Sequence, residues 1–465
     1  MTADLAKIWR QAYEIVPEQL ARVSSVKQVA AAFNTNIDAV TKISGAELSR
    51  LAQLTELTSI NDNSGVNAVN TPQDAVRGMV KCFVGGIAEE WLCENKNADD
   101  WLQKNLRRGH LQMGGQAGII ANVLSVLGVQ RIYTHAASLP QMQAKLFLNA
   151  DNLFAFDEKN DIDKAHNINR KNDEPLIHRI IEFDAGDILF FNNQKYVCPK
   201  SNRFIATYDP ANMSLKIDEG FVKHLNSCGF DFMFLSGFHN LTAKRGGVQK
   251  INDIVPLVQH WKSANPAGII HLELASTQDK TIRREIIDKI APVVDSVGLN
   301  EREALDTLEI IAPNIFASVN TQNPDAATLL GILPILRQKL TTPRIQLHFY
   351  GTYLTLQNKN FTLSPEQNKR GMMLAATVAA AKAKSGNIEN KENLLQAHGG
   401  NIGSAAIKNM EILATALQKP DFAAAGIAEY QGFDLTAVPT VLVDKPRTLV
   451  GMGDTISSVS LIGAI

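Results

Sequence analysis

Near the C-terminus, the sequence carries a glycine-rich turn followed at once by a carboxylate. Gly451-Met452-Gly453-Asp454 leads into a stretch that predicts a helix. Glycines permit positive φ and close backbone approach, so successive N–H groups can converge on an anion at the start of that helix. Asp454 could accept a proton from a hydroxyl that attacks a phosphoryl group. The same residues also fit an ordinary turn whose Asp only caps a helix.

A second polar pair lies on an apolar segment. His271 and Glu273 are two residues apart in the strand predicted over 268–274, so they share one face near its end. A zinc site is disfavoured, because the helical HExxH spacing and a third ligand are missing. A carboxylate and an imidazole that hold the waters of Mg²⁺ fit better. A hydrogen-bonded pair that closes the strand is the structural alternative.

The strand predicted over 293–299 also ends in polar residues. Asn300 and Glu303 are three apart and can face one side at the start of a helix. They form a capping-box pattern, which is compatible with a second role in metal binding. His348, near the end of the strand predicted over 345–349, could reach a nucleotide at the same sheet edge. It could equally be a hydrogen-bonded core histidine.

Two motifs in the N-terminal third suit sugar hydroxyls, which both donate and accept hydrogen bonds. Asn34, Asn36 and Asp38 follow the strand predicted over 29–33. Gly114-Gly115-Gln116 precedes an apolar helix predicted over 119–127. The alternatives are an Asx-rich turn and a plain glycine turn before a helix.

These motifs could meet at one site if their strands end at the same edge of a sheet, and the sequence predicts such a sheet. Apolar runs alternate with helical patterns, as in an α/β protein with a largely parallel sheet. Besides those named above, we predict strands over 232–235 and 438–443 and helices over 253–263, 282–290, 328–339 and 372–384.

The region 151–208 differs in character and predicts a second lobe or lid. It begins with the polar stretch 157–174 and continues with short strands predicted over 176–183, 188–191 and 203–208. The polar segment 59–74 and a helix predicted over 75–94 are assigned to the same lobe.

Length, net charge and cysteine content limit the classes of molecule that this protein is expected to bind. The 465 residues exceed what one compact core usually serves. A net charge of −1 gives no broad electrostatic case for nucleic acid or membrane binding, so we expect a small-molecule partner. The four cysteines form no CxxC pair and predict reduced thiols. With no signal segment and no membrane-length apolar stretch, we expect a cytoplasmic protein. The sequence does not predict an oligomeric state.

Taken in order, the motifs at 34–38, 114–118, 271–273, 300–303 and 451–454 resemble the ADP-dependent glucokinase and phosphofructokinase family, in an archaeal form. Asn202-Arg203-Phe204-Ile205 and the Thr-Ile-Ser-Ser after Asp454 strengthen the resemblance, which spans nearly the whole chain. It implies an α/β fold: a ribokinase-like three-layer α/β/α large domain with a smaller α/β lid. We expect the large domain at 1–42, 108–150 and 215–465, and the lid at 43–107 and 151–214. ADP is then the phosphoryl donor, and AMP is a product.

The resemblance also assigns roles to single residues. Asp454 resembles the catalytic base, and the N–H groups of Gly451, Met452 and Gly453 resemble an anion hole. Glu273 and Glu303 resemble the carboxylates that place Mg²⁺ through its waters, with His271 and Asn300 in support. Arg203 resembles a phosphate-binding arginine, for ADP or for a sugar phosphate.

The acceptor is predicted from two features. Glucokinases of this family hold glucose with a Glu, and Gly86-Ile87-Ala88-Glu89-Glu90 supplies Glu90 at the matching position. The phosphofructokinases add lid cations for the 6-phosphate, and the segment 164–179 offers several, of which Arg179 is preferred because its strand fixes its direction. We therefore expect fructose 6-phosphate as main acceptor and glucose as a second. An ATP-dependent ribokinase-like sugar kinase, an enzyme that acts mainly on glucose, and a noncatalytic binding protein remain alternatives.

Overall fold

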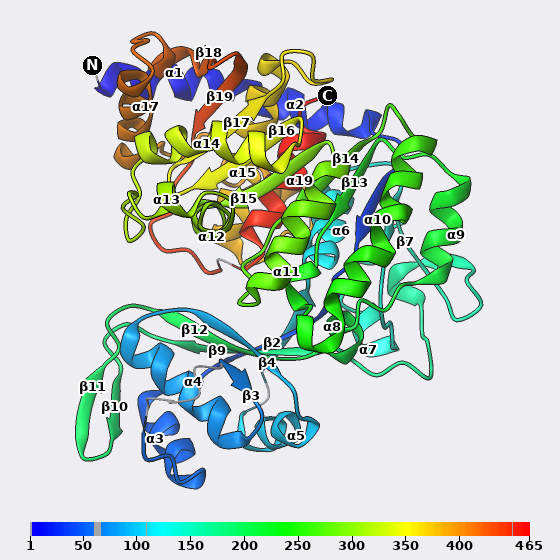
Figure 1. Ribbon diagram of the computed structural model, residues 1–465, viewed down its shortest axis with the longest axis vertical. Coiled ribbons are helices and arrows are strands. Elements are labelled where there is room, and N and C mark those ends of the chain that lie inside the picture. Colours follow the sequence, from blue (N-terminus) through cyan, green and yellow to red (C-terminus); the bar gives the residue numbers. More distant parts are fainter. Residues whose placement is uncertain (1, 60–66, 108, 449) are drawn as a thin grey trace.

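The computed structural model describes residues 2–59, 67–107, 109–448 and 450–465. It has a large part built on one sheet and a small part built on another, and both are visible in Figure 1. The N-terminal helix and the C-terminus both lie at the end of the large part that is remote from the small one.

The large sheet has eleven strands, and seven neighbouring ones, from β7 to β16, run parallel. Strands β8, β17, β19 and β18 extend it in antiparallel fashion at its two edges. This confirms the largely parallel α/β sheet. In spatial order the strands are β18 (Ile427–Tyr430), β19 (Phe433–Pro439), β17 (Thr352–Gln357), β16 (Arg344–Phe349), β15 (Ser296–Asn300), β14 (Ile269–Glu273), β13 (Phe232–Leu235), β1 (Val29–Ala32), β6 (Ile132–Thr134), β7 (Leu153–Phe156) and β8 (Ile162–Lys164).

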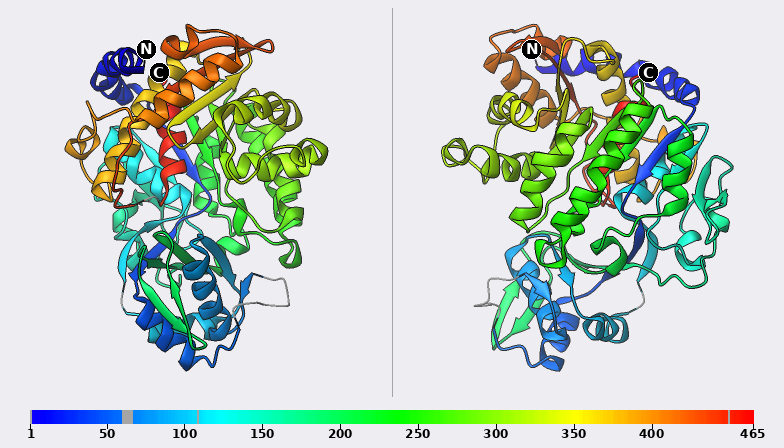
Figure 2. Two further views of the ribbon diagram at one scale, coloured as in Figure 1. Left: turned by 90° about the vertical axis from the view of Figure 1, so that its left-hand side faces the viewer. Right: turned by 45° about the vertical axis from the view of Figure 1, so that its right-hand side comes forward.

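Helices cover both faces of this sheet, which gives three layers (Figure 2). One face carries α2 (Val16–Arg22), α6 (Gln116–Leu127), α15 (Pro365–Ser385) and α19 (Met452–Ile462), which pack on one another. The other carries α10 (Gly247–Ala264), α11 (Lys280–Glu285), α12 (Glu301–Ile311) and α14 (Ala326–Leu340). Residues 371–381 of α15 are almost all apolar, so this part of the helix is buried on every side.

Further helices complete the large part: α1 (Thr2–Ala12), α7 (Gln141–Ala144), α8 (Pro210–Met213), α9 (Glu219–Ser227), α13 (Pro313–Phe316), α16 (Lys391–Leu394), α17 (Ser404–Ala416) and α18 (Phe422–Ala425). Of the strands and helices predicted here, β13, β14, β16 and α14 match within two residues at each end, and β15 begins three residues later than predicted. Helices α10 and α15 end where predicted, within one residue, but begin six and seven residues earlier. The strand predicted over 438–443 is shifted, since β19 already ends at Pro439, whose ring removes a ladder donor.

The small part contains a six-stranded sheet with a core of its own. Its order is β3 (Ala68–Val69), β4 (Glu89–Cys93), β12 (Asn202–Tyr208), β9 (Ile177–Phe183), β2 (Asn36–Lys42) and β5 (His110–Gly114). One face packs on α3 (Gly45–Leu54), α4 (Pro72–Gly85) and α5 (Lys96–Asn105), and a ribbon of β10 (Ile188–Phe191) and β11 (Gln194–Val197) extends from it.

The sheets divide the chain differently from the predicted boundaries. Strands β7 and β8 fall in a range expected in the lid, yet they pair in the large sheet because Leu153, Ala155 and Phe156 are buried in its core. Strands β2 and β5 reach into the small sheet from ranges expected in the large domain.

The helix predicted over 75–94 is wrong in its second half. Helix α4 ends at Gly85, and Gly86 adopts a left-handed conformation with φ 60°, which favours glycine and terminates the helix. The chain then forms β4, in which Trp91 and Cys93 are buried. Part of the predicted polar segment 59–74 lies outside the described residues.

Two further expectations concern the whole chain. All four cysteines are free thiols, and three of them are buried. Among the described helices, none combines the length and the apolar character that a membrane crossing would need.

Candidate active site

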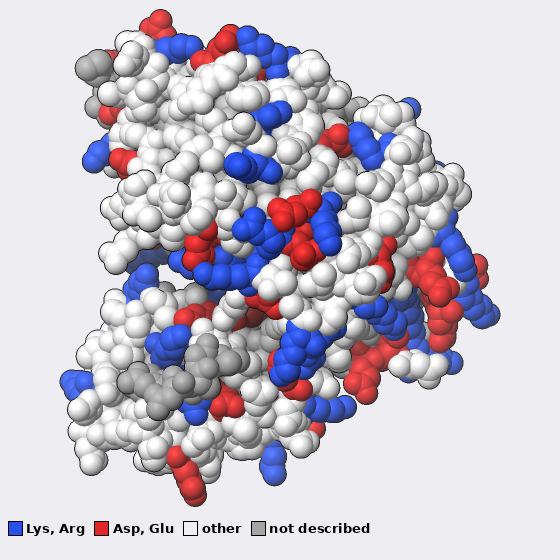
Figure 3. Space-filling view, viewed as in Figure 1, with Lys and Arg blue, Asp and Glu red and all other residues white. Residues whose placement is uncertain are grey.

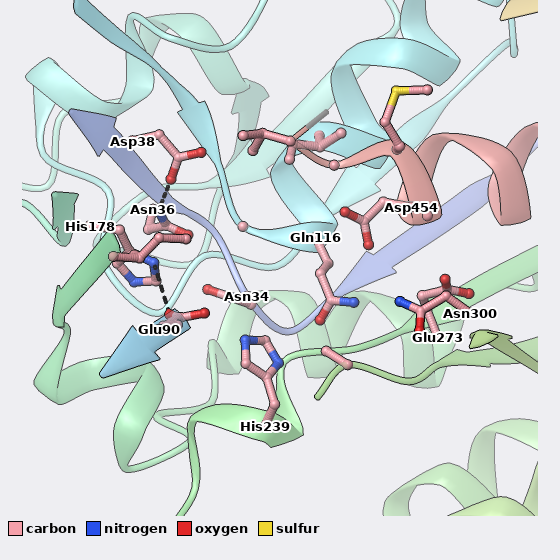
Figure 4. A pocket seen from close by; sticks show the side chains of 18 of the residues that line it. Asn34, Asn36, Asp38, Glu90, Gln116, His178, His239, Glu273, Asn300 and Asp454 are labelled. Atoms are coloured by element: carbon pink, nitrogen blue, oxygen red, sulfur yellow. Dashed lines mark hydrogen bonds and ion pairs between the residues drawn. The ribbon is translucent and has the colours of Figure 1, made fainter. Parts of the chain in front are cut away.

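A polar pocket lies where the free face of the small sheet meets the carboxyl ends of the large-sheet strands (Figure 4). The space-filling view shows a groove between the two parts with acidic and basic side chains along it (Figure 3). Most of the predicted site residues line this pocket: Asn34, Asn36, Asp38, Glu90, Gly115, Gln116, Arg203, Glu273, Asn300, Glu303, His348, Gly451, Met452, Gly453 and Asp454.

The turn before α19 forms one end of the pocket. Gly451 adopts φ 62° as the N-cap of α19, a left-handed conformation that L side chains rarely adopt. A Cβ on Gly453 would lie 3.0 Å from Nε2 of His348 and 3.1 Å from Oε1 of Glu273. Glycine therefore suits the backbone conformation at 451, and at 453 it leaves room for the close approach of two side chains. The unpaired N–H groups of the first turn of α19 face a pocket that can receive an anion.

Asp454 lies in that first turn and is 7% exposed. Burial raises the pKa of Asp454, while the ammonium of Lys382 and a hydrogen bond from Gln116 act against that rise. Figure 4 shows Gln116 beside Asp454. A buried carboxylate with a raised pKa beside an anion site is equipped to accept a proton.

Glu273 ends β14 and is held from behind by a buried network. His271 Nε2 lies 3.1 Å from Glu273 Oε2, and His271 Nδ1 lies 2.9 Å from Ser296 Oγ. The guanidinium of Arg344 donates to the same Ser296 hydroxyl at 2.8 Å, which leaves the hydroxyl proton for Nδ1. His271 is therefore a neutral donor to Glu273 and does not line the pocket. Sequence reasoning missed Ser296 and Arg344.

Asn300 and Glu303 form the predicted capping box at the start of α12. Asn300 Oδ1 accepts from the Glu303 N–H at 2.9 Å, and Glu303 Oε2 accepts from the Asn300 N–H at 2.9 Å. Both residues also line the pocket, so capping and exposure to a ligand coexist. Burial raises the pKa of Glu303 to about 8, with a smaller contribution from the charge of Asp454.

The acidic groups at this end suit a hydrated cation better than a directly bound one. Burial and the charges of Asp454 and Glu303 raise the pKa of Glu273. Such mutual repulsion is relieved by a divalent cation. Within the described ranges, no group of three or more His, Cys, Asp or Glu residues is placed to hold a metal directly. His348 is neutral, because burial lowers its pKa to about 4.

The opposite wall of the pocket begins at the end of β1 and continues along β2. Oδ1 of Asn34 and Oδ1 of Asn36 are buried acceptors that find no partner among the described residues, while Nδ2 of Asn36 donates to Asp38 at 2.8 Å. Gly115 adopts φ 73°, and a Cβ there would meet Asn34 O at 2.5 Å. Gly114 does not line the pocket, but it packs against Asp38 in the same wall. Unpaired acceptors of this kind match the hydroxyls of a sugar.

A row of side chains crosses neighbouring strands at the far end. Asp38 on β2 is paired with His178 on β9, and His178 with Thr207 on β12. Glu90 on β4 accepts a hydrogen bond of 2.5 Å from the Thr207 hydroxyl. His178 Nε2 lies 3.0 Å from the buried Asp209, whose charge helps to keep the pKa of His178 above its usual value despite burial. Sequence reasoning missed His178 and His239, which both line the pocket.

Comparison with known proteins identifies the family of the chain that forms this pocket. The family model of the "ADP-specific Phosphofructokinase/Glucokinase conserved region" matches residues 27–463. This chain belongs to that family. An ADP-dependent glucose/glucosamine kinase of Pyrococcus abyssi is 30% identical over 98% of both chains, and an ADP-specific phosphofructokinase of Methanosarcina acetivorans is 26% identical over 93% of this chain and 92% of the relative.

Solved structures agree with the assignment. An ADP-dependent kinase in complex with fructose 6-phosphate and ADPβS is 25% identical, covers 98% of both chains and superposes with a TM-score of 0.82. The protein is therefore an ADP-dependent sugar kinase, and ADP is its phosphoryl donor. The expected family, the enzyme class and the three-layer α/β fold with a second, smaller α/β part are confirmed.

In this ADP-dependent sugar kinase, Arg179 does not lie where we expected it. His178 and Ile180 face the pocket, so Arg179 between them points to the other face of β9. There its guanidinium binds Asp99 of α5 through Nε at 2.6 Å and a second nitrogen at 3.0 Å. Both side chains are mostly buried, so the pair belongs to the small-part interior. The prediction of Arg179 as a sugar-phosphate ligand is contradicted by this geometry.

The segment 164–179 also offered Lys164, Arg170 and Lys171 as lid cations, and two of these are engaged elsewhere. Lys164 pairs with Asp151, and Arg170 pairs with Asp218 at 2.5 Å, both in the large part of the kinase. Arg203 on β12 does line the pocket, and its Nε has no partner within the described residues. It is therefore available to an anion.

Proposed function

We propose that this kinase transfers the β-phosphoryl group of ADP to fructose 6-phosphate and, as a second acceptor, to glucose. The products are AMP with fructose 1,6-bisphosphate or a glucose phosphate. The observation that carries the proposal is Asp454, buried between the turn at 451–453 and a wall of unpaired sugar-type hydrogen-bonding groups. The free thiols of the chain fit a reducing cytoplasm.

In the proposed reaction, Asp454 takes the proton of the acceptor hydroxyl as its oxygen attacks the β-phosphorus. The new oxygen–phosphorus bond forms while the bond from the β-phosphorus to the bridging oxygen breaks, and AMP leaves. The N–H groups at Gly451, Met452 and Gly453 stabilise charge on the moving group, and Arg203 binds a phosphate. Asn300 and His348 contact the nucleotide from the large-sheet edge.

We also propose that Glu273 and Glu303 hold Mg²⁺ through its waters. Two carboxylates with raised pKa values at one end of the pocket, one of them held by His271, fit such an ion. When bound, Mg²⁺ neutralises phosphate charge and orients the donor. The carboxylates themselves fix where the cation and the phosphates gather.

Two observations bear on the acceptor. The fructose 6-phosphate complex of a solved relative supports the sugar phosphate. The far end of the pocket, with Asp38, Glu90 and His178, supports glucose, because carboxylates accept hydrogen bonds from hydroxyls but repel a phosphate. Arg203 is the arginine that lines this pocket among the described residues, so phosphate binding there has one evident cationic partner.

A coupled assay tests both parts of the proposal. ADP and ATP are each supplied with fructose 6-phosphate and with glucose, and AMP and sugar phosphate are measured. We expect AMP formation with ADP and little turnover with ATP. Absence of turnover with every sugar would contradict the proposed function.

The variant Glu90→Ala separates the acceptors. Removing an acceptor for a hydroxyl should lower kcat/KM for glucose by about tenfold or more and leave fructose 6-phosphate less affected. A matched control is Glu89→Ala, because Glu89 precedes it on β4 and its carboxylate instead binds Lys81 and Trp91. Equal losses for both sugars in Glu90→Ala would contradict its role in acceptor choice.

A further inference from the structure

One lysine in the kinase is buried beside the catalytic turn without lining the substrate pocket. Lys382 lies in the last turn of α15 and is 5% exposed. Its Nζ donates to Gly451 O at 2.9 Å and to Thr455 Oγ1 at 3.2 Å. Among the described residues it is the one buried lysine, and the two groups that its Nζ contacts are a carbonyl and a hydroxyl. Burial of an ammonium group costs free energy, so its presence beside the catalytic turn calls for an explanation.

The atoms that Lys382 contacts define the turn. Gly451 O also accepts from the Thr455 hydroxyl at 2.8 Å and from the Thr455 N–H at 3.2 Å. Three donors therefore hold this carbonyl on the side away from the pocket. A carbonyl oxygen that turned toward the pocket would place its negative end against the phosphoryl group. Fixing it keeps the neighbouring N–H groups available to an anion.

The charge of Lys382 also acts on the base. Its ammonium opposes the rise that burial causes in the pKa of Asp454. Burial lowers the pKa of Lys382 itself to about 8, while the charges of Asp454 and Asp38 act against that fall and favour the charged lysine. No hydrogen bond joins Lys382 to Asp454 among the described contacts, so this action is through space. A positive charge behind the turn favours both an ionised base and an anionic transition state.

We propose that Lys382 is a positioning residue of the phosphoryl-transfer site, which fixes the Gly451 carbonyl and keeps a positive charge behind the turn. The proposal rests on the proposed function, since it concerns the same reaction. Lys382 does not itself line the substrate pocket, so it acts through the turn and through Asp454.

The cavity behind the turn makes the proposal testable by chemical rescue. Lys382 lines a second cavity with Ile119, Asn122 and Asn387, which a small amine can enter. The variant Lys382→Ala removes three methylene groups and the ammonium, the equivalent of n-propylammonium. We expect kcat to fall roughly 10- to 100-fold, because the loss is indirect and one lost anion-hole donor costs roughly 10²- to 10³-fold. KM for the sugar should change less than about threefold.

Adding n-propylammonium should then restore a large part of kcat, whereas n-propanol at the same concentration, or sodium at the same ionic strength, should not. The control Lys384→Ala removes an exposed lysine two residues later on α15 and should leave kcat unchanged. If Lys382→Ala does not fold, Lys382→Met keeps much of the packing without the charge and should show the same loss of kcat.

Three outcomes would overturn the proposal: a kcat within about twofold of wild type in Lys382→Ala or Lys382→Met, rescue by propanol as good as that by propylammonium, or a loss confined to KM. The wild-type protein in the same assay keeps the two proposals distinguishable. No wild-type turnover contradicts the proposed function, while normal wild-type turnover with an unaffected variant contradicts only the role of Lys382.

Discussion

The large-sheet wall of the pocket presents groups at strand ends and at a helix N-terminus, whereas the small-sheet wall presents side chains from the faces of strands. Glu273, Asn300 and the turn at 451–454 occupy points where the chain leaves a strand or enters a helix. His178 and Glu90 instead lie within strands, each as the second residue, and project from the strand face.

This difference matters for what each wall can do. Strand ends in an open parallel sheet converge at one edge, so groups far apart in sequence meet there, and backbone N–H groups are available as well. The face of a strand offers alternate side chains only, and a shift by one residue replaces each of them. The first wall suits the reacting phosphoryl group, and the second suits recognition of hydroxyls.

The largest effect should come from the turn on the large-sheet wall. Asp454→Asn keeps the shape of the side chain but removes the base, so kcat should fall by at least roughly 10²-fold while the sugar still binds. Because burial raises the pKa of Asp454, wild-type kcat should fall as pH drops through that raised pKa, and the variant should lose this dependence. Turnover within about tenfold of wild type, in a folded variant, would remove Asp454 from the role of base.

The second effect tests which side chains of β9 face the pocket and which face the interior of the small part. Arg179→Met leaves the buried carboxylate of Asp99 without its partner and should destabilise the protein by about 3 kcal/mol, seen as a lower unfolding temperature. Acceptor preference should not change, because Arg179 points away from the pocket. The double variant Arg179→Met with Asp99→Leu should recover much of the stability. A selective loss of fructose 6-phosphate use in Arg179→Met would show that the two faces of β9 have been assigned the wrong way round.

The site residues of the two walls differ in how far they could be predicted from the sequence. The turn at 451–454, the capping box at Asn300 and the strand end at Glu273 are local patterns, and all three line the pocket as expected. On β9 the sequence placed polar residues side by side without indicating which face is buried. His178 and Arg179 are adjacent, so their side chains point to opposite faces of β9. Ile181 and Phe183 are buried in the core of the small part, and Arg179 lies on the same face as these two residues.

Other features depend on contacts that no local pattern contains. The sequence predicts a helix through the residues of β4, whereas the left-handed backbone at Gly86 ends α4 before that strand. Arg344 and Ser296 are 48 residues apart, and Ser296 and His271 are 25 apart, so the network behind Glu273 exists only after the sheet forms. The buried position of Lys382 likewise depends on how α15 packs on α19.

The smallest expected effect returns to the large-sheet wall and asks whether its acidic end holds a cation. Glu303→Gln keeps the capping box, since Gln also serves at the third helical position, but it removes one charge. The Mg²⁺ concentration for half-maximal rate should therefore rise about tenfold, with little change in unfolding temperature. The control Glu301→Gln removes a charge from the same helix turn at a residue that does not line the pocket, and it should leave the Mg²⁺ requirement unchanged. If Glu303→Gln lowers stability and leaves the metal requirement as it was, Glu303 acts only as a helix cap.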